Sequence, residues 1–265
     1  MLDASADACL AWAAAGGLQM HSSLAVTTSG ALRGRALMAT ADIPRGTELL
    51  RVPYSLLLTA NDVPPAFDDL GQTNRLAVAL LTERRQPSRW ALPLSMLPET
   101  FDTPLYYTPD QLAWLQGSPL VAWASSRALG IERGFRSVQS RWATTVAAVG
   151  SGGAVEDAGA RLEELRWALS VAWSRSFMVQ LRPGAAKTAS LVPVGDLINH
   201  AENHLANTAS QRSVALTCTL PPAHPRRSLA RSLAHTCSAL VAATLSAPRL
   251  SSTPTGLSRR GTSSA

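Results

Sequence analysis

Acidic residues are missing from the C-terminal stretch of this sequence, since no aspartate or glutamate follows Glu202. Residues 1–208 carry a net charge of −1, and residues 209–265 carry +7 from seven arginines. The formal net charge of +6 therefore comes from the tail. A domain that binds nucleic acid usually carries its basic residues on the folded part. We therefore expect any nucleic-acid contact to be confined to the basic tail.

Cysteines and long apolar runs are also scarce. Cys9, Cys218 and Cys237 form no CxxC pair and no even set, which favours a reducing compartment without disulfides. The N-terminus lacks the basic region and apolar core of a signal peptide, and no uncharged apolar run reaches membrane-spanning length. The sequence therefore predicts a soluble intracellular protein of the cytoplasm, nucleus or plastid, without a membrane partner.

Residues in the first half alternate between strand and helix signals. With 265 residues, 46% of them hydrophobic, the chain can bury a sizeable core. A helix at 8–18 is expected to stop at two glycines, and strands at 36–40 and 47–52 flank a Pro- and Gly-containing turn. This predicts a β-meander. Helices should dominate from about residue 73, with Thr73 as an N-cap and a capping box from Thr108 to Gln111.

The second half repeats this mixture before its composition changes. Leu162, Leu165 and Leu169 predict a helix that runs to about Gln180. A short buried strand at 191–194 should lead into a polar box at 196–200. The tail at 209–265 has one apolar stretch, 232–245, and the rest is predicted to be disordered. We thus expect an α+β fold followed by a basic, acid-free tail.

The polar box has ordinary interpretations when its residues are taken alone. An Asp-x-x-Asn pattern after a strand is typical of a turn or helix cap, which would explain Asp196 and Asn199. His200 and His204 lie four residues apart, as in some zinc sites, but the later Cys and His spacings match no established pattern. We therefore predict no metal.

Four separated stretches, in the correct order, resemble SET-domain methyltransferases of the Rubisco large-subunit methyltransferase branch. They are residues 34–53, residues 98–107 together with 115–120, Ser174–Phe177 and Asp196–His200. The likeness covers roughly residues 8–208. It implies a SET-domain β-fold in residues 1–208 with a large inserted helical subdomain at about 60–165, incomplete at its C-terminal end.

The resemblance also implies S-adenosyl-L-methionine as cofactor and a protein lysine side chain as substrate, without a metal. In it, Arg175 matches an arginine whose guanidinium can bind the cofactor's carboxylate by two parallel hydrogen bonds. Asp196 matches a position that lines both the cofactor and the substrate pockets. The positions that match cofactor contacts are Arg33, Gly34, Arg35, Arg175, Asp196, Asn199 and His200.

One catalytic element of the family is not found in this sequence. Family members carry a catalytic tyrosine after the Asn-His segment, but no tyrosine here follows Tyr107. Tyr54, Tyr106 and Tyr107 match other parts of the pattern, so no catalytic residue is assigned. We therefore expect a protein-lysine N-methyltransferase by descent, truncated or altered after about residue 208, with its activity in question. Protein-histidine methylation and a non-catalytic SET-like binding module remain alternatives.

Overall fold

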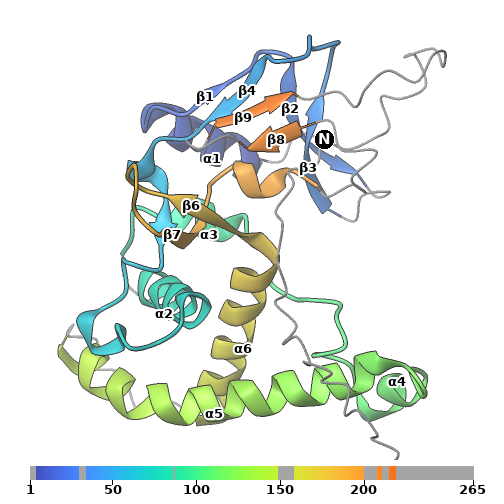
Figure 1. The fold of residues 1–265 in the computed structure, drawn as a ribbon, viewed down its shortest axis with the longest axis vertical. Helices are drawn as coiled ribbons and strands as arrows, with labels where there is room; N and C mark the ends of the chain where they lie inside the picture. The colour runs from blue at the N-terminus through green and yellow to red at the C-terminus, as the bar shows by residue number, and fades with distance from the viewer. Residues whose placement is uncertain are drawn as a thin grey trace, which may run out of the picture.

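A computed structural model describes residues 4–29, 34–85, 87–148, 158–199, 208–210 and 215–218. Figure 1 shows two parts, one with short strands gathered around α1 and the other with the helices α2, α5 and α6. Helix α6 runs from α5 toward β6 and so connects the two parts. The helices are α1 (Ala4–Ala15), α2 (Gln72–Arg84), α3 (Ala91–Ser95), α4 (Pro109–Ala113), α5 (Pro119–Ala148) and α6 (Ala158–Arg175). The strands are β1 (Gln19–Met20), β2 (Leu24–Ser29), β3 (Gly34–Ala39), β4 (Glu48–Arg51), β5 (Leu58–Thr59), β6 (Ser176–Gln180), β7 (Lys187–Leu191), β8 (Thr208–Ser210) and β9 (Ala215–Cys218).

The strands form three small sheets with the orders β1-β4-β9-β8, β2-β3 and β5-β7-β6. The expected meander is wrong in its pairing, because β3 pairs with β2 while β4 pairs with β1 and β9. The predicted turn is present, with Gly46 at φ +86°. Eight residues separate β3 from β4. A connection longer than a tight hairpin loop does not force its flanking strands to pair.

Strand β8 begins at the last residue of the predicted domain and continues into the tail, and β9 lies wholly in the tail that the sequence predicted to be disordered. β9 runs antiparallel to β4, and Leu216 lies opposite Leu50, a fully buried residue. Pairing with a buried strand satisfies backbone groups in a segment that has no strong periodic pattern of its own. The tail therefore contributes at least residues 215–218 to the fold.

Local signals placed the start of one helix correctly and missed others, since the helix expected at 8–18 runs over Ala4–Ala15. Thr108 caps α4 in the predicted capping box with Gln111. The expected cap at Thr73 is wrong, since α2 begins at Gln72 with Gly71 as its N-cap. None of the described helices is long and apolar enough to cross a membrane.

The core helix α6 is shorter than predicted. It ends at Arg175, and the next five residues form β6, which pairs antiparallel with β7 from Ser176 opposite Leu191 to Gln180 opposite Lys187. Residues 176–180 gain a ladder of backbone hydrogen bonds from a strand that follows them in the chain. This pairing places the end of α6 beside the end of β7.

Two apolar cores meet at the end of β7. Leu191 belongs to the core formed mainly by α2, α6 and α5, whereas Val192, Val194 and Leu197 belong to the core around α1 and β2–β4. The segment after β7 thus crosses from one core to the other. It carries the polar box with it.

Candidate functional site

An ion pair joins the end of α6 to the turn that follows β7. Arg175 is the last residue of α6, and Asp196 lies in a 3-10 turn, η4 (Gly195–Leu197). Arg175 Nη1 donates to Asp196 Oδ2 at 2.9 Å and to the Asp196 carbonyl at 3.4 Å. The structure therefore brings two of the residues selected from the sequence into direct contact.

This pair is largely removed from solvent. The side chain of Asp196 is 11% exposed and that of Arg175 is 25% exposed. Burial raises the pKa of Asp196, and the charge and hydrogen bond of Arg175 act in the opposite direction. In the described part of the chain, no hydrogen bond is recorded for Arg175 Nε or Nη2, so two parallel N–H donors remain for another acceptor.

Strand β3 packs against η4 and adds Gly34 and Arg35 to this region. Gly34 has φ +148°, and a Cβ built on it would meet no atom within 4 Å. Its backbone angle, rather than crowding, favours glycine, and the side where a Cβ would lie is open. Arg35 Nη1 donates to the carbonyl of Met96 at 3.4 Å, which links β3 to the residue after α3.

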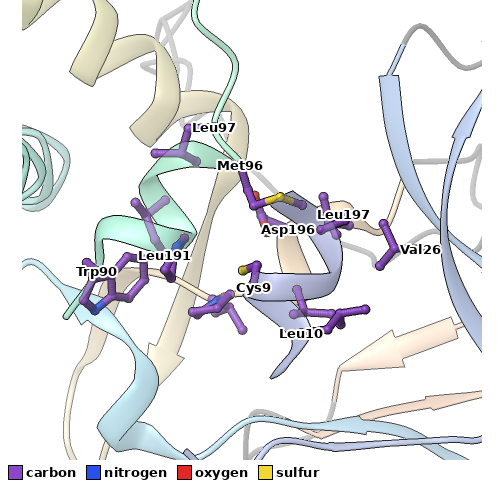
Figure 2. A pocket seen from close by; sticks show the side chains of 14 residues that line it. Cys9, Leu10, Val26, Trp90, Met96, Leu97, Leu191, Asp196 and Leu197 are labelled. Atoms are coloured by element: carbon purple, nitrogen blue, oxygen red, sulfur yellow. The ribbon is translucent and has the colours of Figure 1, made fainter. Parts of the chain in front are cut away.

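A narrow cavity of about 20 Å³, within a recess of about 400 Å³ that includes space open to solvent, is lined by Asp196 of the Arg175–Asp196 pair. Figure 2 shows Cys9 of α1, Met96 and Asp196 around it, with Trp90 at one end and Val26 at the other. Its walls are mainly apolar. Burial, followed by the negative charge of Asp196, raises the pKa of Cys9 to about 11, and Arg35 partly opposes the shift. The charged groups of Asp196 and Arg35 thus both lie close enough to Cys9 to change its pKa.

The sequence-selected residues fall into three groups in the structure. Arg175 and Asp196 are in contact, and Gly34 and Arg35 lie on the strand that packs against η4. Asn199 ends the described segment with its side chain half-buried. Arg33 and His200 lie outside the described residues.

Apart from Asp196, the described residues that line this cavity were not selected from the sequence, Cys9 and Met96 among them. Each of these two lies in a locally apolar helical segment, which gave no sign of a site. The contact between Arg35 and Met96 joins residues 61 positions apart, so no local spacing pattern could have shown it.

No tyrosine lines this cavity in the described part of the chain. The Tyr54 hydroxyl donates to the Gln180 carbonyl at 3.1 Å, and the Tyr106 hydroxyl pairs with Ser170 Oγ at 2.9 Å. Both hydroxyls are therefore committed to other parts of the fold.

Comparison with known proteins gives a consistent set of relatives, although no family model matches the sequence. Actin-histidine N-methyltransferase of Homo sapiens is 28% identical over 182 residues, covering 63% of this chain and 30% of that protein. The chloroplastic fructose-bisphosphate aldolase-lysine N-methyltransferase of Arabidopsis thaliana is 27% identical over 173 residues, covering 63% of this chain and 34% of that protein. The chain thus spans about a third of the length of these curated relatives.

Solved structures match a larger share of the chain. Rubisco LSMT bound to AdoMet superposes with a TM-score of 0.67 at 20% identity, covering 83% of this chain and 50% of that one. The SET domain of LSMT bound to methyl-lysine and AdoHcy gives a TM-score of 0.66 with the same identity and coverage.

Proposed function

Because this chain has the SET-domain fold of the Rubisco large-subunit methyltransferase, we propose that it binds S-adenosyl-L-methionine beside Arg175 and Asp196 and serves methyl transfer to a lysine side chain of a protein. The observation that carries this proposal is the Arg175–Asp196 ion pair, whose Asp196 lines an apolar cavity.

The residues present fit the amino-acid end of this cofactor. That end carries a carboxylate and an ammonium group. The two N–H donors of Arg175 left over from Asp196 match a carboxylate, and the Asp196 carboxylate accepts from an ammonium. Gly34 allows a ligand to approach the backbone closely, since the space at its missing side chain is open.

When bound, the cofactor would supply a methyl group on a positively charged sulfur; a neutral amine would attack the methyl carbon, and the thioether S-adenosylhomocysteine would leave as the C–S bond breaks. The contribution of this chain is position and environment. The cavity walls exclude water around a neutral lysine amine, and the Arg175–Asp196 pair fixes the orientation of the bound amino-acid end. In well-oriented reactions, alignment of the reacting atoms can lower the activation barrier by about 7–11 kcal/mol. No covalent step by the protein is needed for this.

The acceptor is proposed as lysine because one curated relative is named for a lysine substrate and LSMT structures contain methyl-lysine. Other curated relatives are named for an actin histidine, so the two acceptors are distinguished by experiment. Labelled product is hydrolysed and the radioactive amino acid identified as methyl-lysine or methyl-histidine. Methyl-histidine would overturn the lysine assignment while leaving methyl transfer in place.

Cofactor binding is tested by calorimetry with two ligands that differ at one end. S-adenosylhomocysteine has the amino-acid end, and methylthioadenosine lacks it. Arg175→Lys keeps the charge but removes the fork of parallel donors, so we expect the affinity for S-adenosylhomocysteine to fall about tenfold or more. Affinity for methylthioadenosine should not change.

The matched control is Arg51→Lys, which alters an exposed arginine of β4 paired with Glu48. It should change neither affinity. Equal loss of both ligands in Arg175→Lys would contradict the assigned contact, because only one ligand carries a carboxylate. Binding without transfer of labelled methyl to any added protein would support the non-catalytic binding module instead.

A further inference from the structure

A second cavity lies in the helical part, with no lining residue in common with the cavity beside Asp196. It holds about 220 Å³ between α2, α5 and α6, within a wider recess of about 670 Å³ that includes space open to solvent. In Figure 1 these three helices lie in the part of the fold away from α1 and the strands around it. Pockets for drug-sized ligands usually measure about 300–1,000 Å³, so this cavity suits a smaller molecule.

Two glycines of α5 create much of this space. Gly130 and Gly134 lie one helical turn apart on the cavity wall, and a Cβ built on either would meet no atom within 4 Å. The opposite walls are apolar, from Val78 of α2 and from Leu165 and Leu169 of α6. A hydrocarbon or aromatic body would therefore find an apolar surface on several sides.

One charged side chain lines this cavity, Arg127. Its guanidinium carbon lies 4.4 Å from the ring centroid of Trp173 and 5.4 Å from that of Trp123. Among the residues that the structure describes, no carboxylate pairs with it and no hydrogen bond to it is recorded. Contact with indole rings engages the guanidinium plane and leaves N–H donors along its edge.

We propose that this cavity binds a small apolar carboxylate, meaning a carboxylic acid with a hydrocarbon or aromatic body. The carboxylate accepts hydrogen bonds from Arg127, which the two tryptophans hold in place. The apolar body lies against Gly130, Gly134 and the leucines of α6. This site is independent of the proposed methyl transfer, since the two cavities have different walls.

The arrangement favours a carboxylate over a neutral or cationic ligand for a physical reason. A guanidinium at the rim of an apolar cavity interacts more strongly with an anion than it would in bulk water, because the local dielectric is lower. A neutral alcohol of the same length gains the apolar contacts but only a single neutral hydrogen bond. We expect the difference to reach about tenfold in Kd, as for a charge-assisted hydrogen bond compared with a neutral one.

Titration of the full chain with decanoate and with decanol tests this proposal by calorimetry. Decanoate should bind at least tenfold more tightly than decanol. Arg127→Gln should remove that preference, whereas Arg133→Gln, which alters an exposed arginine of the same helix outside the cavity wall, should retain it.

Gly134→Leu provides a second variant that does not depend on Arg127. The added side chain fills the cavity, so both ligands should lose measurable binding, while the thermal midpoint stays the same or rises because leucine favours a helix over glycine. Ala122→Leu on the exposed side of α5 should leave binding unchanged. Absence of decanoate binding, equal affinity for decanoate and decanol, or full binding by a folded Gly134→Leu variant would each overturn the proposal.

Discussion

Replacing Arg175 by methionine should destabilise the protein in a pH-dependent manner. Methionine keeps an unbranched apolar chain but leaves Asp196 buried without its donor at 2.9 Å. A hydrogen bond to a charged group contributes about 1.5–3 kcal/mol, and Arg175 is a quarter exposed, so we expect a loss of about 2 kcal/mol near neutral pH. For a domain of this size the thermal midpoint should fall by roughly 4–8 °C.

The pH dependence follows from the raised pKa of Asp196. A carboxyl whose pKa is higher in the folded than in the unfolded protein stabilises the fold most when protonated, and that contribution is lost as pH rises through the folded-state pKa. Without Arg175, which lowers this pKa, the shift grows. The free energy of unfolding of the variant should therefore decline more steeply above about pH 4 than that of the wild type.

Urea unfolding at about pH 4 and at neutral pH measures both effects, provided the m-value is unchanged. Arg51→Met is the control, because its partner Glu48 and the arginine itself are exposed, and its midpoint should match the wild type. Adding Asp196→Asn to Arg175→Met should remove the extra pH dependence. The reasoning is refuted if Arg175→Met is no more destabilising than Arg51→Met, or if its effect is equal at both pH values.

Three further outcomes follow from single positions. Gly195→Ala should lower the free energy of unfolding in urea by about 1–3 kcal/mol, because the new methyl would lie 2.8 Å from a valine side chain. Gly134→Ala, which has open space around the new methyl, should stabilise the protein slightly. Equal effects of the two substitutions would contradict the packing described for these positions. At pH 8, Cys9 should react with iodoacetamide about a hundredfold more slowly in the folded than in the urea-unfolded chain, because burial raises its pKa to about 11. Peptide mass spectrometry measures both rates. Comparable rates would show that the folded protein has an accessible thiolate at Cys9. Thr108→Ala should lower the free energy of unfolding by about 1 kcal/mol because the capping box is lost, and Thr73→Ala should not. Thermal melts followed by circular dichroism compare the two variants. A lower midpoint for Thr73→Ala than for Thr108→Ala would contradict the assignment of Thr108 as a helix cap.

Features that depend on a few neighbouring residues could be predicted from the sequence. The capping box at Thr108 needs only residues 108–111, which are adjacent in the chain. The end of α6 could not be predicted in this way. Residues 176–180 continue an apolar helical pattern, and only their pairing with β7 makes them a strand.

The candidate site was likewise predictable from the sequence only in part. Resemblance selected Arg175 and Asp196 separately, but their ion pair depends on two apolar cores that place the end of α6 beside the end of β7. Cys9 and Met96 enter the site through packing of α1 and α3, which have no sequence signal for each other. The resemblance thus identified the charged residues, whereas tertiary packing determined which residues surround them.

Val194 explains why Asp196 lies where it does. It has φ +67°, a conformation that costs a β-branched residue on the order of 1–3 kcal/mol, yet it is 3% exposed and packs in the core around α1. The next residue, Gly195, has no room for a side chain against Val192. Apolar packing on both sides thus holds the turn in a strained form that directs Asp196 toward Arg175. The carboxylate is held by the backbone as well as by its ion pair, so a ligand that draws part of the Arg175 guanidinium away would still meet Asp196 in place.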